Sequence, residues 1–328
     1  MKNNFSIHLL LFNLLFLTAY TQNQTYLHKT YTYNQLKAKA FDNSLNETER
    51  LKFTRAYLKK AVIEKSSFRI ARGYYLLGYK NYGKNDNLAL KFLDSSIMIS
   101  RKTPDTLFPA VAYREKAEIL VRKRKFKEGV YNFKKAESYA LKNNFDYYIL
   151  IRDAIATVKS ENLGEINEAL DIYKECFNYY KTNTSSRNKH PETYLNVIFG
   201  LADVYKSLKI SDSSSYYNKL GFEFASKNNN KEYISIFTLN EAAVLTFNGE
   251  YNEAIKKIKI AFPELIKNKD MGNILASYFY LGLCYEGLKK DKLALTNYKK
   301  VDSIYIIRKK ITPEFVGGYK FLINYYKN

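Results

Sequence analysis

The chain has 328 residues, of which 46% are apolar, and it carries 31 Tyr and 21 Phe but no Trp. This apolar content is enough for a large core, while five Pro and 13 Gly are too few for an all-β protein with many tight turns. The formal net charge of +21 admits a nucleic-acid binder. However, Glu and Asp are interleaved with Lys along most of the chain, which favours a solvated surface of mixed charge.

The first segment, MKNNFSIHLLLFNLLFLTAYTQNQ, has the order of a secretory signal: a lysine, an apolar run from Ile7 to Leu17, and an exit of small and polar residues. The run is too short for a comfortable membrane span, which needs about 20 residues. We predict a signal peptide at residues 1–21, cleaved before Gln22, and a leading arm at 22–31. An uncleaved anchor and an amphipathic first helix of the fold are the alternatives. The predicted localisation is export to the periplasm, or association with the membrane if the signal is retained.

Residues 32–67 are expected to be helical, and the segment ERLKFTRAYLKKAVIEKS at 49–66 is expected to be the second half of a diverged first repeat. From residue 71 onward one pattern recurs, and its clearest copy begins at Leu275. That copy has large residues at its positions 4, 7, 11 and 24 and small residues at positions 8 and 20, namely Tyr278, Leu281, Tyr285, Tyr298, Gly282 and Ala294. Small residues let two antiparallel helices cross closely, and the large ones fill the space around the crossing.

The other copies of this pattern begin at residues 71, 110, 150, 195 and 235, so the period is about 40 residues. Three prolines stand near the starts of first helices, where a missing N–H costs little: Pro109, Pro191 and Pro313. Three glycines are expected in the turns between paired helices: Gly83, Gly164 and Gly249. The loop at 181–193 is the best candidate for a linker, but it requires no domain break.

The recurring pattern resembles the tetratricopeptide repeat (TPR) over residues 32–327. The family pattern is a large residue, Leu-Gly and Tyr, followed by Ala, an aromatic residue and Ala. The resemblance implies an all-α, right-handed superhelical solenoid of six to seven antiparallel helix pairs, followed by a C-terminal helix at 312–327. The layout also resembles the sensor halves of TPR histidine kinases and regulators of Bacteroidetes. This sequence departs from them because it contains no kinase motif, no second membrane span and no helix-turn-helix after the repeats.

Residues for catalysis or metal binding are not apparent in the sequence. His28 and His190 have no partner at metal-ligand spacing, and no glycine-rich phosphate loop is present. Cys176 and Cys284 lie in apolar helical patterns and are expected to be buried free thiols. We therefore predict a binding protein rather than an enzyme, with no cofactor and no metal. Its predicted partner is a protein or peptide, with an envelope signalling protein as one candidate.

In the TPR fold the first helices of the pairs line a concave groove. The resemblance therefore implies a set of partner-binding residues on these helices: Tyr75, Tyr79, Arg114, Glu118, Phe199, Asp203, Asn240 and Phe279. An alternative stays open for Tyr75, Tyr79 and Phe279, whose rings could instead pack inside a tightly wound superhelix.

The C-terminal helix at 312–327 carries one apolar stripe at helical spacing, formed by Phe315, Tyr319, Leu322 and Tyr326. Phe321, Ile323 and Tyr325 place further apolar surface on its other side. Because a terminal cap should have a polar outer face, we predict that this helix docks against another chain, either a second copy or a membrane-side partner.

The alternative function is that of a basic helical-repeat protein that binds nucleic acid or an acidic membrane surface. Two basic segments suggest it, VRKRKFK at Val121–Lys127 and IIRKKI at Ile306–Ile311. Export would make nucleic acid an unlikely partner.

Overall fold

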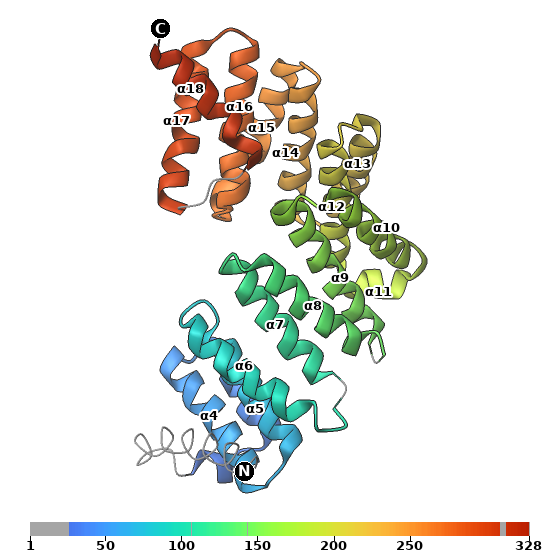
Figure 1. Ribbon diagram of the computed structural model, residues 1–328, viewed down its shortest axis with the longest axis vertical. Helices are drawn as coiled ribbons and strands as arrows, with labels where there is room; N and C mark the ends of the chain where they lie inside the picture. The colour runs from blue at the N-terminus through green and yellow to red at the C-terminus, as the bar shows by residue number, and fades with distance from the viewer. Residues whose placement is uncertain (1–25, 106, 143, 309–312, 328) are drawn as a thin grey trace. The chain divides into compact units, whose positions relative to one another are not determined.

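The computed structural model describes residues 26–105, 107–142, 144–308 and 313–327. Within these residues every regular element is a helix (Figure 1). The helices form two compact units, the first ending at Val158 and the second beginning at Lys159. None of the helices described is both long and apolar enough to cross a membrane. The predicted signal peptide at 1–21 lies outside the described residues, as do the first four residues of the leading arm.

The first unit opens with a short helix inside the predicted leading arm and continues with longer helices. Its elements are α2 (Leu27–Thr30), α3 (Tyr33–Ala40), α4 (Glu47–Ile63), α5 (Ser67–Asn81), α6 (Asp86–Ser100), α7 (Phe108–Arg122), α8 (Phe126–Ala140) and α9 (Phe145–Val158). From α3 onward each helix packs against the next, and α5 also contacts α7. The first helices of consecutive pairs are therefore neighbours.

Local sequence fixes where the early helices begin. Thr32 accepts a hydrogen bond from the backbone N–H of Gln35, and the Gln35 side chain accepts one from the N–H of Thr32. Asn46 and Glu49 make the same reciprocal arrangement at the start of α4. Each of these capping boxes satisfies N–H groups that the first helical turn would otherwise leave without a partner.

The second unit contains a π-helical turn, a 3-10 turn and nine α-helices within the part of it that the structure describes. They are η1 (Lys159–Leu163), α10 (Ile166–Thr182), α11 (Thr184–Lys189), α12 (Pro191–Ser207), α13 (Ser211–Lys227), α14 (Lys231–Phe247), α15 (Tyr251–Lys267), α16 (Met271–Gly287), α17 (Asp291–Arg308), η2 (Pro313–Val316) and α18 (Gly317–Lys327). Consecutive helices from α12 onward pack together, and α14 also contacts both α12 and α16. The first helices again form a row.

The predicted positions of the repeats are confirmed. All six starting positions fall in first helices, namely α5, α7, α9, α12, α14 and α16. The small residue at position 8 also meets the large one near position 24, as expected. A Cβ at Gly282 would lie 2.5 Å from Cε1 of Tyr298, and one at Gly78 would lie 2.8 Å from Cγ of Leu93. The copy that begins at residue 150 is divided, because α9 closes the first unit and α10 belongs to the second.

The predicted turns and thiols are also found. Gly83 and Gly249 have φ of 77° and 83°, in the left-handed region where a residue without Cβ is favoured. Both stand between the two helices of a pair. Cys176 and Cys284 are buried and free. Burial raises the pKa of the Cys284 thiol, which lies 3.2 Å from the hydroxyl of Thr246, so this thiol is held in its unreactive form.

Candidate functional site

Four of the predicted partner-binding residues come together in the first unit. Tyr75 and Tyr79 lie one turn apart on α5, with ring centroids separated by 6.3 Å. Arg114 and Glu118 lie one turn apart on α7, which packs against α5. The charge of Arg114 acts on the Tyr75 hydroxyl, which places the two pairs next to each other. With Glu115, these residues form what we call the α5–α7 face.

The charges of the α5–α7 face do not balance. Arg114 Nη1 is 3.5 Å from Glu115 Oε1, and Arg114 Nη2 is 3.4 Å from Glu118 Oε1. The two other cations of α7 are paired outside this face, Lys116 with Asp94 and Arg122 with Asp86. One guanidinium therefore serves two carboxylates, which leaves one negative charge in excess.

The two carboxylates of this face are only partly in contact with water. The exposed fractions of the side chains are 12% for Glu115 and 32% for Glu118. Burial raises the pKa of both carboxyl groups, and Arg114 opposes this shift without cancelling it, as does the charge of Arg122 at Glu118. Loss of hydration disfavours the charged form of a carboxyl group. A cation brought to this face would therefore stabilise the two carboxylates in place of the lost water.

Aromatic rings border the charged part of the α5–α7 face. Phe41, at the end of α3, lies 5.6 Å from the ring of Tyr79, and both rings are exposed. Lys80 Nζ lies 4.2 Å from the Phe41 centroid. On the other side, Tyr75 meets Phe108 edge to face at 5.4 Å. The face thus combines exposed apolar surface with an excess of carboxylate.

Sequence reasoning missed one residue of this region, Tyr147 on α9. Burial raises the pKa of its hydroxyl to about 12, while the nearby Arg114 lowers it. The Nε of Arg114 is buried and has no hydrogen-bond partner among the described residues. Buried polar atoms are normally paired, so this donor is an unusual feature of the face.

The other predicted groove residues lie in the second unit, where they mainly satisfy one another. Lys206 Nζ is 2.5 Å from Asp203 Oδ1 and 2.9 Å from Asn240 Oδ1, and its side chain is only 7% exposed. Asn240 donates to Asn218 Oδ1 at 3.1 Å and is 4% exposed. Asn240 is therefore held in the interior rather than presented to a partner. Lys206 was missed, although it occupies position 12 of its repeat, which faces the groove in the TPR pattern.

For Phe279 the geometry agrees with the packing alternative. Its ring is 3% exposed and lies 4.8 Å from that of Phe315. Phe199 is half-buried and meets the buried ring of Phe237 at 6.2 Å. Tyr79 differs from these two because its side chain stays exposed.

The C-terminal stripe needs a correction. Phe315 is buried, the Tyr319 hydroxyl donates to Asp302 Oδ1 at 2.7 Å, and Leu322 packs on the core of the second unit. These residues cover α16 and α17, because α18 packs on this pair as the first helix of a further repeat would. Of the predicted stripe only Tyr326 is exposed. The residues that face outward are Ile323, Tyr325 and Tyr326.

No metal site is found within the described ranges, which contain no group of three or more His, Cys, Asp or Glu side chains able to hold an ion. His28 is buried, and its pKa is lowered by burial and by Lys59, Lys29 and Lys60. It is therefore neutral near pH 7, in surroundings dominated by lysine charge.

Comparison with known proteins supports the fold. No protein-family profile and no curated protein sequence matches this chain. The apo form of RapI is similar in structure, with a TM-score of 0.69 at 15% identity over 85% of this chain and 99% of its own. A Rap protein complexed with Competence and Sporulation Factor gives 0.53 at 14% identity, over 80% and 77%. A tetratricopeptide repeat protein from Parabacteroides merdae gives 0.50 at 18% identity, over 74% and 84%. The chain therefore has a TPR-like helical-repeat fold.

Proposed function

We propose that this chain is a scaffold that binds a peptide or protein segment, and that the α5–α7 face is part of its contact surface. The observation that carries the proposal is the meeting of exposed aromatic rings and an unbalanced carboxylate cluster on consecutive first helices. One structural neighbour, the Rap protein, is seen in complex with a factor, which supports binding as a use of this fold.

The chemistry of the face specifies the segment that fits it. The uncompensated carboxylate calls for a Lys or Arg side chain, because a charge-assisted hydrogen bond to a half-buried carboxylate is among the stronger polar contacts. The rings of Phe41 and Tyr79 offer a surface for an apolar side chain next to that cation, or for the cation itself. We therefore propose a segment that carries a basic residue beside an aliphatic or aromatic one.

The basic segment Val121–Lys127 gives less support to nucleic acid or an acidic membrane as partner. Its cations are largely engaged within the unit, since Arg122 pairs with Asp86, Lys123 donates to Asn87 and Lys125 pairs with Glu128. Surface pairs of this kind are weak, but they leave fewer free donors for phosphates.

We propose further that the chain is exported and meets its partner in the cell envelope. The proposal rests on the apolar core of residues 7–17 and its small-residue exit. The expected result is that protein extracted from the native envelope lacks residues 1–21 and begins at Gln22, as measured by intact mass. A full-length species in the cytosol would contradict export and would make nucleic acid a credible partner again.

A contact between two copies is the other part of the proposal. The outward side of α18 exposes Ile323 and Tyr326 by 53% and 64%. Adjacent exposed apolar residues often belong to an interface, so we assign this side of α18 to a second copy of the chain.

Glu118→Gln tests the α5–α7 face. A basic peptide selected on the wild type from a random display library is expected to bind this variant roughly ten to a hundred times more weakly. Hydrogen bonds to charged groups contribute about 1.5–3 kcal/mol, and about 1.4 kcal/mol is a factor of ten in affinity. Fluorescence anisotropy of the labelled peptide measures the change.

The same variant is expected to become more stable at neutral pH. The folded chain raises the pKa of the Glu118 carboxyl, so it keeps a proton over a pH range in which the unfolded chain has lost it. Below the ordinary glutamate pKa the group is protonated in both the folded and the unfolded chain, and it costs no stability. As the pH rises through the raised value, the folded chain has to hold a disfavoured charge, and stability is lost. Removing the charge should therefore raise the melting temperature at pH 7 and change it little below pH 4.5.

Glu253→Gln is the matched control, because Glu253 is an exposed glutamate of the second unit paired with Lys256. It removes the same charge at a site far from α7 in the sequence and should leave peptide affinity unchanged. If Glu118→Gln loses stability and affinity together at pH 7, Glu118 has a structural role and the proposed face is wrong. Equal weakening by Glu253→Gln would mean that overall charge, not this face, attracts the peptide.

A further inference from the structure

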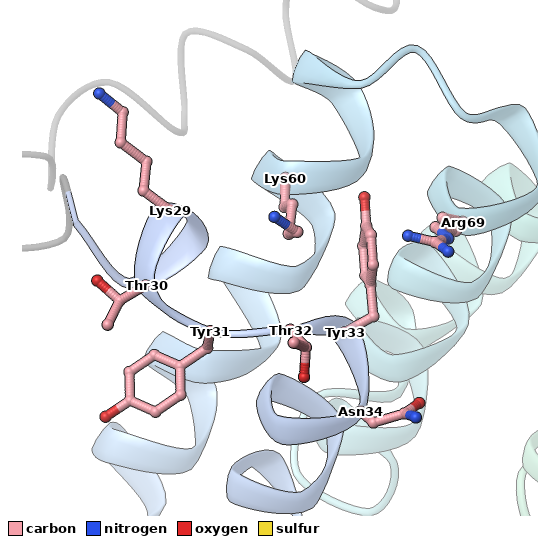
Figure 2. Close-up of a pocket in the computed structure, with 8 residues that line it drawn as sticks. All are labelled: Lys29, Thr30, Tyr31, Thr32, Tyr33, Asn34, Lys60 and Arg69. Carbon is pink, nitrogen blue, oxygen red and sulfur yellow. The ribbon is translucent and has the colours of Figure 1, made fainter.

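A cavity of about 390 Å³ opens in the first unit, between the link from α2 to α3, the end of α4 and the start of α5 (Figure 2). Eight residues line it: Lys29, Thr30, Tyr31, Thr32, Tyr33, Asn34, Lys60 and Arg69. Three of these are cations, four carry hydroxyl groups, and none is an Asp or Glu. The wall is therefore rich in hydrogen-bond donors and positive charge.

Two of the cations are held in place by one aromatic ring. Figure 2 shows the ring of Tyr33 between Lys60 and Arg69, with Lys60 Nζ 5.5 Å and Arg69 Cζ 3.8 Å from its centroid. Tyr33 is itself fixed, because its hydroxyl donates to Glu64 Oε2 at 2.8 Å. Cations stacked on a fixed ring lose less side-chain freedom when a ligand binds.

Among the residues that the structure describes, Glu64 is the one carboxylate that contacts both of these cations. Its Oε1 lies 3.2 Å from Lys60 Nζ, and its Oε2 lies 3.6 Å from Arg69 Nη1. Counting Lys29, the group holds three positive charges and one negative, which leaves two in excess. The lowered pKa of the neighbouring His28, to which Lys29 and Lys60 both contribute, agrees with a positive potential here.

Donors remain free in this cavity. Lys60 uses one N–H for the carbonyl oxygen of His28 at 3.1 Å and one for Glu64, and an ammonium group has three. At the start of α3 the capping box uses the N–H groups of Thr32 and Gln35. The intervening N–H groups of Tyr33 and Asn34 have no acceptor among the described residues. They stand at the positive end of the helix, where anions are favoured.

We propose that this cavity binds a phosphate group, with Lys60, Arg69 and the first turn of α3 as donors. The donors come from three elements, so they match an acceptor whose oxygens point in several directions, as those of phosphate do and those of a planar carboxylate do not. The volume is many times the roughly 30 Å³ that one water occupies in the liquid, which leaves room for an organic group attached to the phosphate. That group is either part of a soluble compound or of a lipid.

Glu64 sets the strength of this site. In the empty cavity it neutralises part of the charge of Lys60 and Arg69, and a bound phosphate must compete with it. Glu64→Gln is therefore expected to tighten phosphate binding several-fold, while Arg69→Gln is expected to weaken it about tenfold or more. Lys256→Gln, which removes an exposed cation of the second unit, is the matched control and should have no effect.

The experiment is a calorimetric titration of the full chain with inorganic phosphate at constant ionic strength, with sodium chloride as the reference titrant. Because Arg69→Gln also removes the contact with Tyr33, circular dichroism checks that it is folded. Glu64→Gln keeps every cation and so tests the charge independently. The proposal requires the two variants to move phosphate affinity in opposite directions. Any other result, or a wild-type response to phosphate no larger than that to chloride, overturns it.

Vesicles then separate the two sources of phosphate. Flotation uses vesicles of phosphatidylcholine with phosphatidic acid, and vesicles of phosphatidylcholine alone as the blank. If Arg69→Gln weakens both phosphate binding and binding to the acidic vesicles, the ligand is a lipid head group. If only phosphate binding depends on Arg69, or the acidic vesicles are not bound at all, the ligand is a soluble phosphorylated compound. Both results require the phosphate site, and the titration alone decides whether that site exists.

Discussion

Gly282→Leu is expected to loosen the C-terminal helices of the second unit and to cost roughly 1–3 kcal/mol, the usual range for overpacking a well-filled core. A Cβ at this position would lie 2.5 Å from Cε1 and 2.8 Å from Cδ1 of Tyr298. Side-chain atoms do not approach so closely, so either the ring or one of the two helices has to move.

The ring of Tyr298 has little room to move. It is 1% exposed, and its hydroxyl donates to Glu286 Oε2 at 2.7 Å, one turn beyond Gly282 on α16. On α18, a Cβ at Gly318 would lie 2.7 Å from Cδ1 of the same ring. Rotation of the ring would therefore break a half-buried hydrogen bond or collide with α18, so the strain should be relieved by separation of α16 from α17.

Hydrogen exchange measures this effect. Compared with the wild type, exchange in Gly282→Leu should become faster in residues 275–301 and stay nearly unchanged in the first unit. This follows because stability in a repeat protein is close to a sum of local and neighbouring terms. Gly272→Leu makes the same change in the exposed first turn of α16, where a Cβ meets only Asp270 Oδ1 at 3.4 Å. This control should leave exchange unchanged. Unaltered exchange near residues 275–301 in Gly282→Leu would contradict the close crossing.

The repeat positions were predicted correctly and the exposure of the C-terminal stripe was not, and both outcomes have the same physical origin. Gly282 and Tyr298 lie in one helical hairpin, so their contact follows from spacing along the chain. The stripe of α18 was also real, but periodicity shows only that a face is apolar and not which chain covers it. The preceding hairpin covers Phe315, Tyr319 and Leu322, and leaves Ile323 and Tyr326 outside.

The candidate site could be predicted only in part for a related reason. The repeat pattern placed Tyr79 and Arg114 on first helices, and the structure brings those helices together. Whether a residue at such a position is exposed depends on its neighbours, and Asn240 and Phe279 are buried by partners that spacing does not specify. The cavity beside Tyr33 depends on the segment before residue 71, where the repeat pattern is too diverged to guide prediction.

A chain that ends at Lys310 is expected to lose stability in the second unit and to aggregate. Truncation removes η2 and α18, and with them Phe315 and Phe321, which pack on Phe279 and Tyr298 at 4.8 Å and 5.1 Å. Full burial of a large apolar side chain is worth about 1.5–3 kcal/mol, so exposure of two or three rings should cost several kcal/mol. Thermal unfolding and light scattering measure both effects, and a truncated chain that melts like the wild type would show that α18 is not a cap.

The double variant Ile323→Ser, Tyr326→Ser separates capping from contact between copies. It keeps the inner side of α18, where Tyr319 bonds to Asp302 and Phe321 packs on Tyr298, so its melting temperature should stay close to that of the wild type. It removes the exposed apolar side, so light scattering should report a lower molar mass than for the wild type. If both proteins are monomers at all concentrations, α18 only caps the second unit, and the apolar residues on its outer side do not join two copies.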